Sequence, residues 1–296
     1  MIRLSFTVAL NYEIRDTTAD FVFNIHAART AQQVVVSESL TTSQPTQPSE
    51  YIDPQTDTRL LRLRAEPGPF ALSYAATVDI DHHFESRARL EEVPIARLPG
   101  AVLQYITPSR YCPSDAMRRF AGREFGHLRP GYWRVHAIHE WVRTRTAFTS
   151  GSSHDGTSAL DTLVGQVGVC RDFAHLMIAL CRALNIPARF VSGIDYGAPV
   201  TMGPPDFHAY VEVFLGNRWY AFDPTGITAP MGLVRIGTGR DAADIAFATM
   251  FGSVQSFAPV ISIVAVEDAA AGFSLPQHSD EAVSTSPGPL PADGAA

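Results

Sequence analysis

The composition of the 296-residue chain is that of a folded, mildly acidic protein. Hydrophobic residues make up 46% of the chain and charged residues 18%, which is enough apolar material for packed cores and excludes the disordered class. The formal net charge is −7, and no basic patch of the kind found in nucleic-acid-binding proteins stands out, so we expect no nucleic-acid partner. No apolar run approaches the roughly 18 residues that a membrane span requires, so we expect no membrane contact.

The first 85 residues have the pattern of an all-β domain. Apolar and polar side chains alternate from residue 2 to residue 10, and polar residues follow at once without a cleavage site, which favours a strand over a signal peptide. Further strands are predicted at residues 21–25, 34–36, 60–63 and 70–80. Turn-rich segments at residues 41–50 and 66–69 separate them, which is typical of a β-sandwich. His82 and His83 are interpreted as an exposed pair rather than as metal ligands.

From about residue 98 the pattern becomes helical. Ser114 is a suitable N-cap for a first helix, and a second helix has apolar side chains at helical spacing, namely Val135, Ile138, Trp141 and Val142. His136 and His139 in this second helix are interpreted as surface or packing residues. A polar loop at residues 148–158 precedes a third helix, which begins near Cys170 and ends at Asn185.

These patterns divide the chain into four parts. We predict a β-sandwich domain at residues 1–85, a linker at 86–100, a catalytic domain at 101–270 and a disordered tail at 271–296. The fold class is therefore expected to be α+β. The tail is assigned as disordered because it is rich in Pro, Ser, Ala, Gly and Asp.

Cys170 has the setting that a nucleophile needs. It follows a glycine-containing stretch and opens the third predicted helix, where unpaired N–H groups and the helix dipole favour a thiolate and can stabilise an oxyanion. Cys181 lies eleven positions further, about 16 Å along a helix, which is too far for a disulfide with Cys170. Cys181 and Cys112 are interpreted as structural. Three widely spaced cysteines indicate a reducing compartment, and we expect a cytoplasmic location.

A hairpin at residues 208–223 carries the other two candidate residues. Gly216-Asn217 is suited to a two-residue turn, and that turn places His208 and Asp223 as diagonal neighbours on one sheet face, about 7–8 Å apart. The opposite face is apolar and carries Ala209, Val211, Val213, Leu215, Tyr220 and Phe222. A thiol nucleophile needs a base, and the base needs an acceptor that fixes its tautomer. His208 can supply the first role and Asp223 the second.

Several short stretches resemble the core of bacterial transglutaminase-like proteins. They are Gly168-Val-Cys-Arg-Asp-Phe-Ala-His175, Ile186-Pro-Ala-Arg189, Asp206-Phe-His-Ala-Tyr210 and Trp219-Tyr-Ala-Phe-Asp-Pro-Thr225. Residues 108–112 and 239–242 fit the same subgroup, which includes proteins of the cysteine protease type. The β-rich region before them resembles the extra domain that often precedes this core.

The resemblance implies a papain-like α+β core in which Cys170 is the nucleophile, His208 the general base and acid, and Asp223 the orienting residue. The oxyanion donor is expected to be the Cys170 backbone N–H, with the Gln166 amide as a second candidate. Asp172 is expected to support the first helical turn, and His175 to be structural because it points away from Cys170. Better-known crosslinking members have Gln and Trp beside the cysteine, whereas Val169 and Arg171 stand here. This departure, and the absence of an EF-hand pattern, disfavour calcium-dependent crosslinking.

The sequence thus predicts an enzyme that transfers an acyl group from a peptide or protein amide through a thioester, with hydrolysis favoured. Protein crosslinking and a catalytically silent peptide-binding module are the alternatives. No Cys-x-x-Cys or His-x-x-x-His spacing is present, so neither a metal nor a cofactor is expected. A papain-type protease is disfavoured because Cys170 and His208 are only 38 positions apart.

Overall fold

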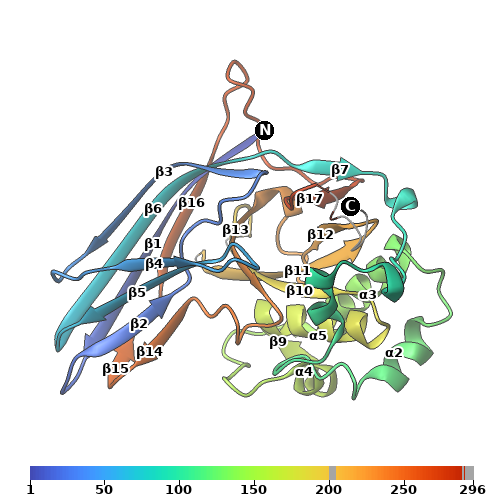
Figure 1. Cartoon of the computed structure of the whole chain (residues 1–296), viewed down its shortest axis with the longest axis horizontal. Coiled ribbons are helices and arrows are strands. Elements are labelled where there is room, and N and C mark those ends of the chain that lie inside the picture. Colours follow the sequence, from blue (N-terminus) through green and yellow to red (C-terminus); the bar gives the residue numbers. More distant parts are fainter. Residues whose placement is uncertain (200–204, 289, 291–296) are drawn as a thin grey trace.

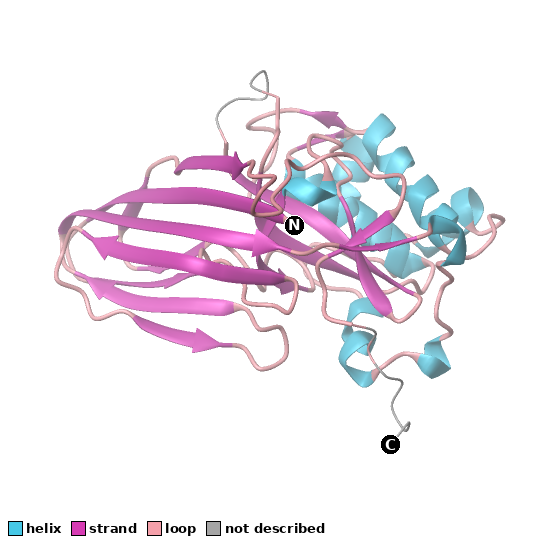
Figure 2. Cartoon of the chain, turned by 90° about the horizontal axis from the view of Figure 1, so that it is seen from above, coloured by secondary structure: helices cyan, strands magenta, loops and turns pink. Residues whose placement is uncertain are grey.

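The computed structural model describes residues 1–199, 205–288 and 290. Two antiparallel sheets form a β-sandwich on one side, five helices pack on the other, and a third sheet lies between them (Figures 1 and 2). No helix in the described part of the chain is long and apolar enough to cross a membrane. The structure confirms the α+β class with a sheet-rich N-terminal domain.

The β-sandwich is built from the strands that the alternating pattern predicted. One sheet has the order β15-β1-β6-β3, with β16 also paired to β1, and the other has the order β14-β2-β5-β4. The bounds are β1 Ile2–Ile14, β2 Ala19–Phe23, β3 Gln33–Thr42, β4 Ser49–Ile52, β5 Arg59–Ala65 and β6 Gly68–Ile80. Every second residue of β1 is buried, which places its apolar side chains between the two sheets. The short strand β4 falls at the end of a segment that was predicted as a turn.

The end of the predicted catalytic domain belongs instead to the sandwich. β14 (Ala248–Phe251) pairs with β2, whereas β15 (Val254–Ser256) and β16 (Val260–Val266) pair with β1. The boundary at residue 270 is therefore wrong. The reason is that β14, β15 and β16 lie more than 200 residues after β1 and β2 in the sequence. The local sequence pattern cannot show that these late strands pair with the edges of β1 and β2.

The helices α2 to α5 cover one face of the central sheet, whereas Val102 of the short helix α1 packs against Phe214 and Trp219 on the other face. The helix bounds are α1 Gly100–Leu103, α2 Arg118–Phe125, α3 Tyr132–Arg145, α4 Ala159–Gly165 and α5 Cys170–Ala183. Short 3₁₀ turns occur at Arg87–Arg89, Ile95–Arg97, Gln104–Ile106 and Pro230–Gly232, and the two-residue strands β8 (Ala147–Phe148) and β9 (Val167–Gly168) pair in parallel. The predicted second and third helices correspond to α3 and α5. The first predicted helix begins later, at Arg118, because Ser114 lies in a preceding turn.

The central sheet has the strand order β12-β11-β10-β13. Its bounds are β10 Ala188–Asp195, β11 Phe207–Leu215, β12 Arg218–Phe222 and β13 Leu233–Gly239. The predicted hairpin register is confirmed, with Leu215 opposite Arg218 and Val211 opposite Phe222. The apolar hairpin face packs against α5. The other face is buried too, since Tyr210, Glu212 and Phe214 are all inaccessible to solvent.

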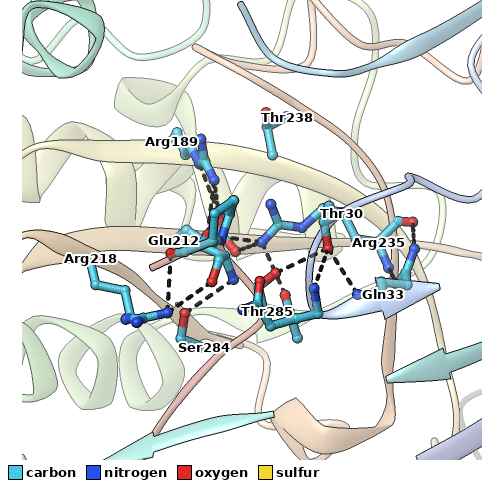
Figure 3. Close-up of polar contacts among 12 residues, drawn as sticks. Thr30, Gln33, Arg189, Glu212, Arg218, Arg235, Thr238, Ser284 and Thr285 are labelled. Carbon is cyan, nitrogen blue, oxygen red and sulfur yellow. Dashed lines mark hydrogen bonds and ion pairs between the residues drawn. The ribbon is translucent and has the colours of Figure 1, made fainter. Parts of the chain in front are cut away.

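The C-terminal segment covers part of that second face, so the predicted disordered tail is wrong for these residues. β17 (Ala282–Ser284) pairs with β7 (His83–Glu85), and Ser284, Thr285 and Ser286 are buried. A polar network fixes the segment, in which Arg235 donates to Glu212 and to Thr285 Oγ1, and Arg218 donates to the Ser286 carbonyl (Figure 3). Residues 289 and 291–296 of the predicted tail lie outside the described residues.

His82 also differs from its prediction. Its side chain is 9% exposed rather than solvated, and its ring lies 6.2 Å from that of Phe84. Its burial raises the cost of protonating the ring, and the pKa of His82 is lowered to about 4 by this desolvation and by the nearby N-terminal charge.

Candidate active site

Cys170 stands at the first position of α5. The residue before it, Val169, is extended (φ −107°, ψ 177°), and its carbonyl accepts hydrogen bonds from the N–H groups of Asp172 and Phe173. The Asp172 carboxylate in turn accepts the Val169 N–H at 2.9 Å, which closes the start of the helix. This is the role expected for Asp172. Within the described residues the Cys170 N–H has no hydrogen-bond acceptor, so it is free to bind an oxyanion.

The first turn of α5 is anchored from outside the helix. Asp172 is 1% exposed and accepts a hydrogen bond from Ser153 Oγ at 2.9 Å. Arg171 donates to the same Ser153 hydroxyl at 2.6 Å and to the His154 carbonyl at 2.8 Å. The polar loop at residues 148–158 thus holds the helix start in place.

His208 lies at the second position of β11, opposite Gly193 of β10. Its ring is 5% exposed, and its Nε2 lies 3.1 Å from Asp223 Oδ1. Cys170 is close enough to the ring to help raise its pKa, and the thiol donates to the Phe207 carbonyl at a distance of 3.8 Å. Because Nε2 faces Asp223, Nδ1 is the nitrogen left for the thiol. The structure therefore brings together the three residues that the sequence pointed to.

Asp223 follows β12 and is fixed by several hydrogen bonds. Its Oδ1 accepts from the Thr225 hydroxyl at 2.7 Å and the Thr225 N–H at 3.1 Å, and its Oδ2 accepts from the Thr228 N–H at 3.3 Å. Its backbone carbonyl accepts a hydrogen bond of 2.7 Å from His139 Nε2. A carboxylate held in this way can orient an imidazole without moving itself.

The electrostatics of the His208–Asp223 pair favour an ion pair. Burial by itself disfavours a charged ring, but the charge and hydrogen bond of Asp223, together with Cys170, outweigh it and raise the pKa of His208 well above its ordinary value. Burial likewise disfavours the Asp223 carboxylate, but the charge and hydrogen bond of His208 outweigh it, and the pKa of Asp223 is lowered. Both shifts favour a protonated His208 ring beside an ionised Asp223 carboxylate.

Cys170 and His208 line a cavity of about 490 Å³. Another wall comes from the segment between β13 and β14, whose Phe247 stacks on Phe207 of β11 with ring centroids 4.6 Å apart. Ala248, the first residue of β14, also lines the cavity, so the β-sandwich contributes to its edge. Asp155 and Asp206 add two carboxylates to the lining.

The other predicted site residues lie elsewhere. Gln166 is exposed, has a left-handed backbone (φ 55°) as the C-cap of α4 and does not line the cavity, so the structure does not bring its amide to Cys170. His175 is fully buried, stacks on Tyr111 at 5.0 Å and accepts the Ala242 N–H at 3.2 Å, in keeping with its structural interpretation. Cys112 and Cys181 are buried and free.

Sequence reasoning missed two features of the site. Asp195 at the end of β10 is buried near both His208 and Asp223, and the pKa of its carboxyl is raised, chiefly by burial. The wall formed by residues 245–248 was also missed, although the Gly239–Ala242 stretch just before it was recognised. Neither feature has a local signal, because both depend on how distant strands meet.

The geometry can be compared with known proteins. Residues 119–224 match the family model of the transglutaminase-like superfamily core, and residues 2–101 match the N-terminal domain of bacterial transglutaminase. The crystal structure of a "putative cysteine protease" from Cytophaga hutchinsonii is 38% identical, with a TM-score of 0.87 over 96% of this chain and 97% of that one. The chain belongs to the transglutaminase-like superfamily.

Mycobacteria have relatives of this transglutaminase-like protein. An uncharacterized protein of Mycobacterium leprae is 26% identical over 73% of this chain and 80% of its own length. An uncharacterized protein of Mycobacterium tuberculosis is 30% identical over 51% of this chain and 52% of its own length. The transglutaminase-like core that these matches establish contains Cys170, His208 and Asp223 within the matched residues 119–224.

Proposed function

We propose that this transglutaminase-like protein is a cysteine-dependent enzyme that cleaves an amide bond of a peptide or protein through a thioester acyl-enzyme. The observation that supports this most is that the Cys170 thiol and the buried His208 ring line one cavity, with the Asp223 carboxylate 3.1 Å behind the ring. The similarity to the "putative cysteine protease" of Cytophaga hutchinsonii is in keeping with the proposal.

The reaction begins with a thiolate–imidazolium pair. The Cys170 thiolate attacks the amide carbonyl carbon, and the Cys170 N–H stabilises the oxyanion that forms. The His208 imidazolium then gives its Nδ1 proton to the leaving amine, and the C–N bond breaks to leave a thioester. Asp223 keeps Nε2–H in place throughout, so that Nδ1 always faces the sulfur.

The second half of the reaction, hydrolysis of the thioester, returns the enzyme to its starting state. Neutral His208 takes a proton from a water molecule, whose oxygen attacks the thioester carbonyl carbon. The C–S bond then breaks and releases the carboxylic acid and the Cys170 thiolate, with His208 protonated again. The cavity of about 490 Å³, with Phe207 and Phe247 on one wall and Asp206 on the rim, is where we place the substrate.

Alkylation of Cys170 by iodoacetamide tests the nucleophile. We expect rapid alkylation at pH 6, where an ordinary thiol with a pKa of about 8.5 is well under about 1% ionised. His208→Ala should remove this low-pH reactivity, whereas His127→Ala, at an exposed position after α2, should retain it. Alkylation with an ordinary thiol profile that His208→Ala leaves unchanged would contradict the proposal and favour a silent peptide-binding module.

Transamidation is the second candidate, because both matched family models derive from transglutaminase-like proteins. It uses the same thioester but an amine as the acceptor. Release of aminomethylcoumarin from peptides that carry it as a C-terminal amide measures hydrolysis. Incorporation of a fluorescent primary amine into casein measures transamidation. Incorporation that exceeds hydrolysis would assign the chain as a crosslinking enzyme.

The three free cysteines are in keeping with a reducing compartment, and we propose the cytoplasm.

A further inference from the structure

A group of potential metal ligands lies behind Asp223, on a second cavity that Cys170 does not line. His136, His139 and Glu140 are spaced i, i+3 and i+4 on α3, so their side chains share one face of the helix. One ligating atom from each lies within 4.8 Å of the others. The cavity has a volume of about 290 Å³ and also reaches Asp223.

The hydrogen bonds of His139 fix which of its nitrogens faces this group. A backbone carbonyl can only accept a hydrogen bond, so the contact of 2.7 Å between Nε2 and the Asp223 carbonyl requires a proton on Nε2. In the neutral ring Nδ1 then carries a lone pair, and it lies 3.1 Å from Glu140 Oε1. A lone pair facing a carboxylate oxygen is repulsive unless a cation lies between them. That cation is either a proton or a metal ion.

The surroundings favour a metal ion over a proton. The His136 ring stacks on that of His139, with centroids 5.9 Å apart and planes inclined by 16°, and supplies a second nitrogen donor. No hydrogen bond to His136 is found among the described residues, so its nitrogens are available. Two imidazoles and a carboxylate are the donor set typical of zinc sites with an open position.

Two of the three donors, His139 and Glu140, also have an outer partner of the kind that metal sites use. His139 donates its second ring N–H to the Asp223 carbonyl, the usual arrangement for a histidine bound to a metal. Arg143 donates to Glu140 Oε2 at 2.6 and 3.0 Å, which leaves Oε1 free for a cation. The open position faces the cavity, where His278 of the C-terminal segment is a further lining residue.

We propose that His136, His139 and Glu140 form a binding site for a divalent transition-metal cation, for which Zn²⁺ is the fitting ion. The site lies outside the proposed reaction. A bound ion would hold the His139 ring, and that ring holds the Asp223 carbonyl, so the site would fix the backbone at Asp223 from behind. This proposal replaces the sequence-based expectation that neither a metal nor a cofactor is bound.

Calorimetric titration of the full chain with Zn²⁺ tests the site. Cys170 and His208 could bind zinc themselves, so Cys170→Ala is the starting protein. We expect one Zn²⁺ per chain. The added substitution His136→Ala should weaken binding at least tenfold, whereas the added His127→Ala, which removes an exposed histidine elsewhere, should leave it unchanged. His136→Ala breaks no hydrogen bond among the described residues, and Glu140→Gln serves as a second variant that preserves shape.

Visible absorption of the Co²⁺-loaded Cys170→Ala protein gives an independent readout. Coordination by two nitrogens and a carboxylate should produce a d–d band that His136→Ala removes. The absence of Zn²⁺ binding, or binding of equal strength in the His136→Ala and Glu140→Gln variants, would overturn the proposal. It would identify the His139–Glu140 contact as an ordinary ion pair that shares a proton.

Discussion

The Glu212 carboxylate of β11 forms an ion pair with Arg189 of the neighbouring strand β10, with a nitrogen–oxygen distance of 2.6 Å. The carboxylate is completely buried, and its other oxygen accepts a hydrogen bond from Arg235 of β13. Arg235 in turn donates to Thr285 Oγ1 (Figure 3). One acidic side chain thus joins three strands of the central sheet to the C-terminal segment.

Replacement of Glu212 should therefore destabilise the folded protein strongly. Glu212→Ala leaves the buried guanidinium group of Arg235 and the half-buried one of Arg189 without their counter-charge, and removing one partner of a buried pair costs about 3–5 kcal/mol. We expect a decrease of that size in the free energy of unfolding, measured by urea denaturation. Asp20→Ala removes an exposed carboxylate that pairs with Arg64 and should change stability little. Equal effects of the two substitutions would show that burial of the network does not determine its energy.

Asp223→Asn should weaken catalysis and change its pH dependence. The charge and hydrogen bond of Asp223 raise the pKa of His208, so their loss lowers it, and the ring loses its proton at a lower pH. We expect the alkaline limb of the hydrolysis profile to move to lower pH and the rate to fall by about 10²–10⁴-fold. Asp155→Asn removes a carboxylate on the same cavity and serves as the control. An unmoved alkaline limb would exclude Asp223 as the residue that keeps His208 protonated.

His82 should make the protein less stable in acid. Its pKa is about 4 in the folded chain and 6.5 in the reference state, so the unfolded chain binds a proton first as the pH falls. The contribution of His82 to the free energy of unfolding is fully present above pH 6.5. It is lost as the pH falls towards 4, which lowers that free energy by up to about 3 kcal/mol. Urea denaturation of wild type and His82→Gln at several pH values between 7.5 and 4 should show a shallower decline in the variant. The free energy of unfolding of His127→Gln should decline with pH as that of wild type does.

Gly193 should tolerate no side chain. A Cβ at this position would lie 2.4 Å from the Val234 carbonyl oxygen and 3.1 Å from Tyr210 Cε1, so β10 would have to move away from β13. We expect Gly193→Ala to lower the free energy of unfolding by about 1–3 kcal/mol. It should also slow alkylation of Cys170, because Gly193 is the cross-strand partner of His208.

Gly122→Ala is the matched control for this prediction. Gly122 lies in α2, and a Cβ there would meet nothing within 4 Å. Alanine is the better helix former by about 1 kcal/mol, so this variant should be at least as stable as wild type. If Gly193→Ala were equally stable, the close approach of β10 and β13 would not be required.

The sequence by itself determined the local elements and the residues of the candidate site. Alternating side chains specified β1 and β6, helical spacing specified α3, and Gly216-Asn217 set the register of the β11–β12 hairpin. That register was enough to place His208 beside Asp223. These signals are local, because strand and helix periodicity and turn chemistry are carried by residues close together in the chain.

Only the tertiary structure decided which segments that are distant in sequence pair and pack together. β14, β15 and β16 return to β1 and β2, and the C-terminal segment covers the central sheet, although their local composition indicated a different domain or disorder. The same packing buries His82, and it exposes Gln166 away from Cys170. Such pairings depend on which sheet edges and faces remain uncovered after the rest of the chain has folded, and no short stretch of sequence carries that information.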